Sequence, residues 1–217
     1  MKTWLTPDWP APANVHAAIT TRAGGVSRGP YASFNLAGHV GDDPAAVARN
    51  REILRARLHL PADPGWLTQV HGCRVATAND RVSGCEADAR YSRTPGEVCA
   101  VLTADCLPLL ICDRAGQQVC AVHAGWRGLA GGVIEAALAA LECPAQELLV
   151  WLGPAIGPRA FEVGDEVRAA FIAQANEAQA AFRATTPGHW LADLYALARQ
   201  RLNAAGVGYI GGGEYCT

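Results

Sequence analysis

Apolar runs separated by polar turns dominate the middle of the chain. The runs at 98–105, 108–113 and 117–123 are each long enough for a buried strand, and a turn at 114–116 separates the last two. A further run at 148–153 predicts another strand. Because continuous apolar runs are typical of strands whose sheet is covered on both faces, the pattern predicts a central sheet of that kind.

Helical and weaker strand signals surround this centre. Asp43 followed by Pro44 is an N-cap and first-turn pair, so it predicts a helix that ends near Leu58. Further helices are predicted at 129–142, 164–183 and 190–205, and short strands at 15–21, 66–70, 73–77 and 207–210. The sequence has no internal repeat, low-complexity linker or sharp shift in composition. It therefore predicts a single α+β domain over residues 1–217, with a mixed β-sheet covered by helices.

Composition and charge exclude several function classes. Half of the 217 residues are hydrophobic and 18% are charged, which excludes a disordered chain. The formal net charge of −2 offers no basic surface to nucleic acid or to an anionic membrane, so neither is an expected partner. Lys2 is the only lysine among 18 basic residues, so P-loop, Schiff-base and pyridoxal-phosphate chemistry each lack their required lysine.

The N-terminus and the cysteines predict a cytoplasmic protein. Prolines at 7, 10 and 12 interrupt the segment where a signal peptide needs an apolar run, and no apolar stretch reaches the roughly 18 residues of a membrane span. Without export, the 8 cysteines are expected to stay reduced. No CxxC motif occurs, so the spacing indicates neither a zinc ribbon nor a thioredoxin site.

Three residues of metal-ligand type stand at predicted strand ends: His71 in TQVHG, Cys106 in TADCLP and His123 in VHAGWRG. Strand ends are where side chains from distant positions in the sequence can converge on one pocket. Two imidazoles and one thiolate suit Zn²⁺, and three protein ligands leave a position for water or substrate, as in catalytic zinc sites. The separations of 35 and 17 residues match no short metal motif, so two core histidines and a buried cysteine remain the alternative.

Residues beside these ligands are candidates for substrate chemistry. Asp105 can act as an acid or base or orient a ligand histidine, and a carboxylate satisfied by backbone N–H groups is the alternative. The segment 123–132 predicts a strand, a turn and a helix, where Gly125 allows a ligand to approach the backbone and Arg127 offers positive charge to an anion. Trp126 can stack on a planar base, and simple packing is its alternative.

Longer motifs carry a family resemblance. In chain order they are RAGGVS, HVGDDP, QVHG, TADCLPLL, VHAGWRGLAGGV and LGPAIGP-x-x-FEVGDEV. On these motifs the chain resembles the YfiH/YlmD family, also called the polyphenol oxidase or laccase-domain family, which includes purine nucleoside phosphorylases. The resemblance implies a YfiH-like fold, similar to a class once proposed to be cysteine hydrolases. Relatives usually continue past the segment that corresponds to 214–217, so we expect this chain to lack the family's C-terminal end segment and to expose the 207–210 strand as an edge.

The resemblance also implies an activity. It implies a zinc site at His71, Cys106 and His123, phosphorolysis of adenosine, inosine, guanosine and methylthioadenosine, and hydrolytic deamination of adenosine as a second activity. The expected partners are therefore purine nucleosides and inorganic phosphate. The expected state is a monomer or a weak homo-oligomer.

For this reaction we assign substrate roles around the predicted zinc site. Trp126 offers a flat surface to the base, while Arg127 and the backbone at Gly125 offer donors to the phosphate. Asp105 is the candidate proton donor to the departing base, although a carboxyl group must be desolvated to hold a proton near neutral pH. The candidate catalytic residues are therefore Cys106, Asp105 and Arg127, and the candidate substrate-binding residues are Trp126, Arg127 and Gly125.

Three other functions compete with this interpretation. One is copper-dependent oxidation. A blue-copper site usually needs an axial methionine, and Met1 is the only methionine, while a multi-copper array needs more imidazoles than 6 histidines supply. Cu²⁺ can nevertheless enter a site with two histidines and one cysteine. Cys106 could instead be the nucleophile of a hydrolase, for example in peptidoglycan precursor editing, to which the family is also linked. A zinc-stabilised binding module is the third alternative, with Cys73 or Cys85 as a fourth ligand.

Overall fold

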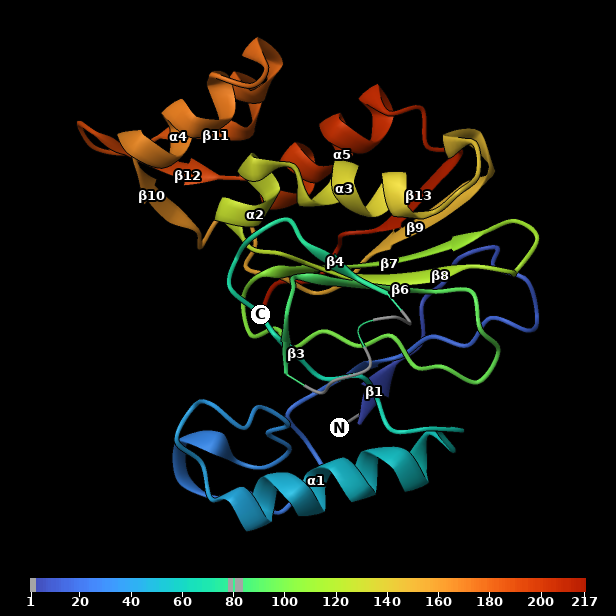
Figure 1. Ribbon diagram of the computed structural model, residues 1–217. Coiled ribbons are helices and arrows are strands. Elements are labelled where there is room, and N and C mark those ends of the chain that lie inside the picture. The colour runs from blue at the N-terminus through green and yellow to red at the C-terminus, as the bar shows by residue number, and fades with distance from the viewer. Residues whose placement is uncertain (1–2, 78–79, 81–83) are drawn as a thin grey trace.

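The computed structural model describes residues 3–77, 80 and 84–217, and its centre is a six-stranded sheet in the order β13-β9-β7-β8-β6-β4 (Figure 1). The strands are β4 (Val75–Ala76), β6 (Ala89–Ser92), β7 (Leu107–Asp113), β8 (Val119–Ala124), β9 (Leu148–Leu152) and β13 (Tyr209–Gly212). The outer pairs β4–β6 and β13–β9 are parallel, whereas the inner neighbours are antiparallel. The predicted α+β class with a mixed sheet is therefore confirmed.

Three helices cover one face of this sheet: α2 (Trp126–Gly131), α3 (Val133–Ala140) and α5 (Leu194–Ala204) (Figure 1). Because side chains alternate along a strand, every second residue of β7 and β8 faces the helices. Leu109, Val122 and Ala124 are fully buried there, in one cluster with Val133 and Ile134 of α3. The residues between them, which include His123, face the opposite side of the sheet.

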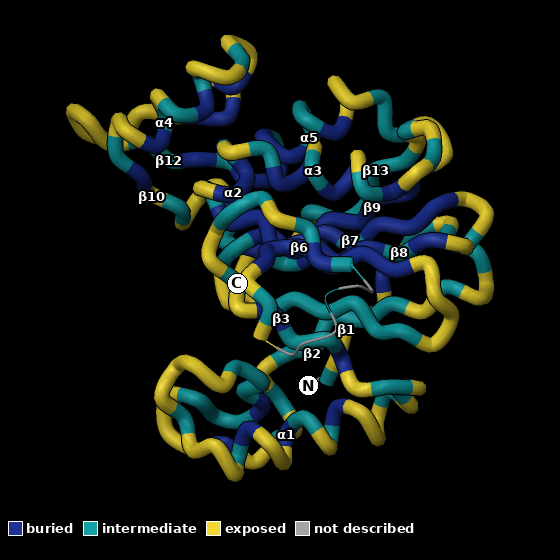
Figure 2. The backbone as a smooth tube through the Cα atoms, viewed as in Figure 1, coloured by how far each residue is buried: buried dark blue, intermediate teal, exposed yellow. Residues whose placement is uncertain are grey.

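Elements between residues 4 and 86 cover that opposite side. They are β1 (Trp4–Leu5), β2 (Ile19–Thr20), β3 (Leu67–Thr68), β5 (Cys85–Glu86) and the outlying helix α1 (Pro44–Arg57). Figure 1 shows β1, β3 and α1 below the sheet. A Cβ atom added to Gly153 would touch both Pro108 of β7 and Ile19 of β2, so the layers are in contact. All five residues of β9 are buried, as the dark centre of Figure 2 shows. The prediction of a sheet covered on both faces is confirmed.

A second, three-stranded sheet in the order β10-β12-β11 lies beside the helical layer (Figure 1). Its elements are β10 (Glu162–Gly164), β11 (Phe182–Ala184) and β12 (His189–Ala192), with α4 (Asp165–Ile172) between β10 and β11. Three short 3-10 helices complete the described elements: Gly29–Tyr31, Ala145–Glu147 and Asn176–Ala181. Val163, Phe171 and Phe182 belong to the main buried cluster, so this sheet is anchored in the central core.

Helix boundaries show what sequence patterns predict well and poorly. Helix α1 begins as predicted, with the Asp43 carboxylate accepting a hydrogen bond from the Ala45 N–H at 2.9 Å. The single helix predicted at 129–142 is instead two, because Gly132 adopts a left-handed conformation with φ of 101° between α2 and α3. The helices predicted at 164–183 and 190–205 were partly wrong, since β11 and β12 take up one end of each range.

The strand predicted at 98–105 was wrong: these residues, all described, form no strand. Val101 of this run still packs against a small buried cluster, which consists of Leu67, Ala76 and Ala87. Part of the backbone pairs with a side chain instead of a strand. The Gln69 amide donates to the Leu102 carbonyl and accepts from the Leu102 N–H, both at 2.7 Å.

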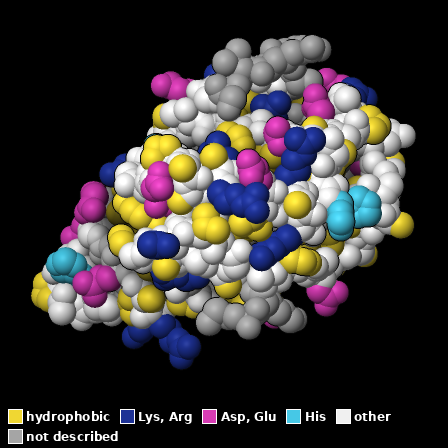
Figure 3. All heavy atoms as spheres, turned by 90° about the horizontal axis from the view of Figure 1, so that it is seen from below, with side chains coloured by type: hydrophobic (Ala, Val, Ile, Leu, Met, Phe, Trp, Pro, Cys, Tyr) yellow, Lys and Arg dark blue, Asp and Glu magenta, His cyan; other side chains and the backbone are white. Residues whose placement is uncertain are grey.

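The molecular surface seen from below mixes charges of both signs. Lys and Arg side chains on this face are interspersed with acidic and hydrophobic ones (Figure 3). Two arginines of α1 form ion pairs with acidic residues: Arg49 with Glu52 at 2.7 Å and Arg55 with Asp63 at 3.2 Å. Within the described ranges, no helix combines the length and the apolar character that crossing a bilayer requires.

Candidate metal centre

The three predicted ligand residues come together at one end of the β7–β8 hairpin. Cys106 directly precedes β7 and His123 is the penultimate residue of β8, so the antiparallel register, with Pro108 opposite His123, places them side by side. His71 lies in the turn between β3 and β4. Their potential ligand atoms all lie within 4.8 Å of one another. The Cys106 Sγ and His71 Nε2 atoms are 3.9 Å apart, and the two imidazole rings meet edge to face with centroids 4.8 Å apart.

Glycines allow this close approach. A Cβ atom on Gly125, the residue before α2, would lie 2.6 Å from His71 Cδ2 and 3.0 Å from Cys106 Sγ. A Cβ atom on Gly128 would lie 2.8 Å from the Gly72 carbonyl oxygen. Real Cβ contacts of this length do not occur, so the glycines of the GWRG segment serve the packing of the ligand residues as well as the turn. Gly125 therefore packs against His71 and Cys106. Its predicted role in binding the substrate stays a prediction.

Asp88, which the sequence analysis missed, connects the two histidines. Its side chain is fully buried just before β6, and one carboxylate oxygen lies 2.8 Å from His123 Nδ1. The same carboxylate accepts hydrogen bonds from the backbone N–H groups of Val70, His71 and Gly72. An acidic residue between two alanines is the signal in the sequence that could have identified it.

Burial controls the protonation of the ligand residues. Burial raises the pKa of the Cys106 thiol above its ordinary value, and the charges of Asp105 and Asp88 raise it further. Burial lowers the pKa of His123, although the hydrogen bond to Asp88 and the negative charge of Asp88 both act to raise it. Without a bound cation, Cys106 is therefore a protonated thiol and His123 a neutral imidazole. A nearby dication would favour the thiolate, and neutral imidazole is the form of histidine that binds metals.

The donor set fits a zinc ion. Two imidazole nitrogens and one sulfur are ligands that zinc prefers, and three protein ligands leave one position for a substrate or water. The 3.9 Å between Cys106 Sγ and His71 Nε2 is close to the roughly 3.5 Å that separates ligand atoms around a tetrahedral zinc ion. His71 is exposed and Cys106 half-buried, so the group is open to solvent on one side.

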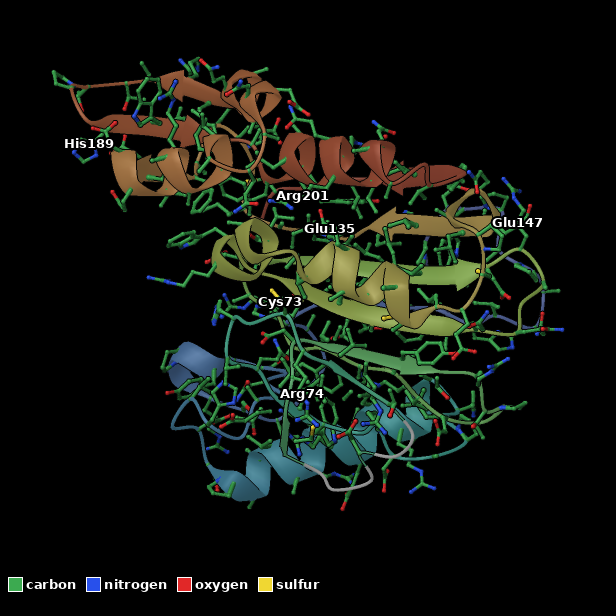
Figure 4. The ribbon with its side chains drawn as sticks, turned by 45° about the horizontal axis from the view of Figure 1, so that its top comes forward. Cys73, Arg74, Glu135, Glu147, His189 and Arg201 are labelled. Carbon is green, nitrogen blue, oxygen red and sulfur yellow. The ribbon has the colours of Figure 1, made fainter. Side chains whose placement is uncertain are left out.

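Cys73 and Cys85, the candidates for a fourth ligand, do not join this group. Among the described residues, the metal-type group at this position contains only His71, Cys106 and His123. The Cys73 thiol lies under α2, 3.6 Å from the Gly128 carbonyl oxygen, and Figure 4 shows it on the side of the helices while Arg74 points to the layer below. The Cys85 Sγ atom lies 3.1 Å from Arg74 Nη1 and contacts this guanidinium. The geometry of the described chain therefore favours an open site over a closed structural one.

Asp105 lies next to the ligand group but outside it. Its side chain is exposed, and its Oδ1 atom accepts a hydrogen bond from the Thr217 hydroxyl at 2.8 Å. Its carbonyl oxygen accepts from the Ile156 N–H at 2.9 Å, which joins the Cys106 segment to the loop after β9. Its predicted role as a proton donor stays a prediction.

Trp126 and Arg127 begin α2 directly after Gly125. The Arg127 guanidinium stacks over the Trp126 ring with its central carbon 4.4 Å from the ring centroid. Trp126 is half-buried against the main core, whereas Arg127 is exposed. The structure therefore places an aromatic ring and a cation directly after Gly125, and Trp126 has a packing role. The substrate roles predicted for Trp126 and Arg127 stay predictions.

Comparisons with known proteins agree with this fold. Residues 16–217 match the family model described as multi-copper polyphenol oxidoreductase laccase. A Pseudomonas aeruginosa protein named as a purine nucleoside phosphorylase is 57% identical over 218 residues, which cover 100% of this chain and 89% of that protein. The crystal structure of a Neisseria meningitidis protein of the DUF152 family has a TM-score of 0.95 at 53% identity and covers 99% of this chain and 88% of its own. YlmD from Geobacillus stearothermophilus has a TM-score of 0.88 at 31% identity, with 99% and 86% covered.

The fold and the site thus define an α+β protein with an open group of two histidines and one cysteine at the end of a β-hairpin. The chain belongs to the multi-copper polyphenol oxidoreductase laccase family, which confirms the predicted relationship to YfiH and YlmD.

Proposed function

We propose that this protein is a zinc-dependent purine nucleoside phosphorylase. The proposed substrates are adenosine, inosine, guanosine and methylthioadenosine, with hydrolytic deamination of adenosine as a second activity. The observation that carries the proposal is the assembly of His71, Cys106 and His123 into one open group, in a chain 57% identical over its full length to a protein named for this activity. The 8 cysteines are all free, which supports a cytoplasmic location.

In this proposal His71, Cys106 and His123 would hold Zn²⁺. A zinc ion bound there would act as a Lewis acid that polarises an oxygen of phosphate or water. Phosphorolysis forms a bond between a phosphate oxygen and the ribose C1′ carbon while the bond from C1′ to the purine nitrogen breaks. The purine leaves with a proton, and the products are the free base and ribose 1-phosphate.

The residues beside the metal centre would position the substrates. Trp126 is the candidate surface on which a purine would stack, in place of the Arg127 guanidinium that covers its ring at 4.4 Å. The displaced guanidinium of Arg127 would offer donors that match phosphate geometry. Asp105 is the candidate for protonating the departing base. Because its side chain is exposed, this role requires a bound nucleoside to shield the carboxyl group from water.

The geometry disfavours the three competing functions. A cysteine nucleophile needs a lowered thiol pKa, but burial and two acids raise the pKa of Cys106, which argues against a hydrolase of peptidoglycan precursors or other substrates. The three ligands supply one metal position, which is fewer than a multi-copper oxidase needs, although Cu²⁺ could bind the same donors. A purely structural zinc site would be closed by a fourth ligand, and neither Cys73 nor Cys85 approaches it.

Incubation of zinc-loaded protein with adenosine, with and without inorganic phosphate, tests the proposal directly. We expect adenine to form only when phosphate is present, because phosphate is the group that attacks the ribose. We expect inosine to form without phosphate, since deamination needs only a water molecule, which adds to C6 of the purine ring while ammonia leaves. Chromatographic separation of adenine, adenosine and inosine measures both outcomes. Zinc-loaded protein that forms neither product would contradict the proposed function.

Replacing Arg127 with alanine should weaken phosphorolysis more than deamination. Hydrogen bonds to charged groups contribute about 1.5–3 kcal/mol, so phosphorolysis should fall roughly ten- to one-hundred-fold. Deamination uses no phosphate and should change much less. Arg49→Ala is the matched control, because Arg49 is an exposed arginine of α1 that pairs with Glu52. An equal loss of both activities in Arg127→Ala protein would show that Arg127 is structural.

A further inference from the structure

The buried carboxylate of Asp88 is the point at which two ligand-bearing segments meet. Asp88 Oδ1 lies 2.8 Å from His123 Nδ1 and accepts from the His71 N–H at 2.9 Å. Asp88 Oδ2 accepts from the Gly72 N–H at 2.7 Å and from the Val70 N–H at 3.2 Å. In addition, the Asp88 carbonyl oxygen accepts from the His123 N–H at 2.7 Å. One residue, fully shielded from solvent, therefore holds both predicted histidine ligands.

We propose that Asp88 is the positioning residue of the metal centre, selecting the Nδ1-protonated tautomer of His123 and fixing the 70–72 turn that presents His71. The inference rests on the metal-binding part of the proposed function. With the proton held on Nδ1 by the carboxylate, the lone pair of His123 Nε2 is free for a metal ion. Asp88 itself acts through the histidines and touches no substrate.

The 70–72 turn needs an anion at this position. Three successive backbone N–H groups point at the carboxylate, an arrangement that makes a concave anion site known as a nest. His71 at its centre has φ of 60°, a left-handed conformation that non-glycine residues rarely adopt. The Asp88 carboxylate satisfies the N–H groups that this conformation exposes to the interior. The turn thus keeps its shape before any metal ion binds.

The number of donors explains why an amide cannot replace the carboxylate. Both oxygens of Asp88 accept, and together they face three backbone N–H groups and one imidazole nitrogen. Asparagine has one accepting oxygen and one NH₂ group that only donates. If its NH₂ group faced His123, Nδ1 would have to accept and the proton would move to Nε2, the ligand atom. If it faced Val70 and Gly72 instead, two N–H groups would meet another donor, against only the His71 N–H in the first orientation. The first orientation is therefore favoured, and the Nε2–H form follows from it.

Two variants separate this role from general stability. Asp113→Asn is the matched control, because Asp113 is another buried aspartate whose carboxylate accepts backbone N–H bonds from Gln117 and Gln118 at the far end of the hairpin. Gln69→Ala breaks two hydrogen bonds of the His71 segment without touching His123. Neither change alters the partner of His123 Nδ1. Both should therefore keep its tautomer.

The experiment measures the His123 tautomer in zinc-free protein by long-range ¹H–¹⁵N correlation, at a pH above the range in which histidine titrates. We expect the Nδ1–H form in wild type, Asp113→Asn and Gln69→Ala proteins, and the Nε2–H form in Asp88→Asn protein. Zinc affinity, measured by competition with a chelator, should fall roughly 10- to 100-fold in Asp88→Asn protein. Asp88→Glu keeps the accepting charge and should keep the Nδ1–H form.

Several results would overturn the inference. An Nε2–H tautomer in the wild type would do so without any variant, even if Asp88→Asn protein does not fold. Wild-type tautomer and zinc affinity in folded Asp88→Asn protein would also contradict it, as would an Nε2–H form in Asp88→Glu protein. Failure of the proposed function looks different: wild-type protein would then bind no zinc, whatever tautomer His123 has.

Discussion

Wild-type protein is expected to bind about one zinc ion per chain, and Cys106→Ala protein is expected to lose it. The substitution removes the only sulfur ligand and leaves two imidazoles, with no other thiol in the group that the structure describes. Losing a residue that merely supports a ligand costs roughly 10- to 100-fold in metal affinity, so losing the ligand itself should cost at least about 100-fold. Elemental analysis of the purified proteins measures the result.

Cys143→Ala provides the matched control, because Cys143 is also a half-buried free thiol but packs against the main core away from the histidines. It should keep the zinc content of the wild type. His71→Ala and His123→Ala should lose zinc as Cys106→Ala does. Unchanged zinc in Cys106→Ala protein would remove this residue from the metal site.

Gly125→Ala is expected to disable the centre although glycine offers no ligand. The new Cβ atom would lie 2.6 Å from His71 Cδ2 and 3.0 Å from Cys106 Sγ, so both ligand side chains must move apart. A displacement of about 1 Å in a catalytic arrangement can cost 10²-fold in rate, and we expect a loss of that order in phosphorolysis. Zinc affinity should fall with it. Both are measured alongside the melting temperature, to separate site damage from unfolding.

Gly38→Ala is the comparison for this variant. Gly38 has no positive φ, and the nearest atom to an added Cβ is Arg51 Nη2 at 3.9 Å, so the methyl group has room. The Gly38→Ala protein should therefore match the wild type in zinc binding and turnover. Wild-type turnover in Gly125→Ala protein would mean that the observed spacing of His71 and Cys106 is not the working one.

The sequence predicted the grouping of three residues better than the elements that hold them. His71, Cys106 and His123 were singled out because each stands at the end of a predicted strand next to a turn, and the family motifs supported the same positions. The structure brings the three side chains together. The hairpin of β7 and β8 was predictable because its strands are long and buried on both faces. That hairpin alone places Cys106 beside His123.

What the sequence could not supply is pairing between distant segments. Asp88 contacts the turn at 70–72 and His123, and neither contact follows from its neighbours in the chain. The run at 98–105 has the hydropathy of a strand, but its Leu102 backbone forms hydrogen bonds with the side chain of Gln69 and not with a neighbouring strand. The short strands β10 and β12 carry exposed residues such as Glu162 and His189, so their pattern is too weak to separate them from helices.

The long separation of the ligands in sequence has a thermodynamic consequence. His71 and His123 are 52 positions apart (123 − 71), and the pairing of β6 with β8 together with the contacts of Asp88 brings their side chains together in the native fold. An ion that binds this assembled group therefore binds the native state in preference to the unfolded chain, and linkage stabilises the native state by about 1.4 kcal/mol for each tenfold rise in free zinc above the dissociation constant. The abundance of the folded enzyme would then follow the supply of zinc, so metal starvation would deplete the protein as well as its activity.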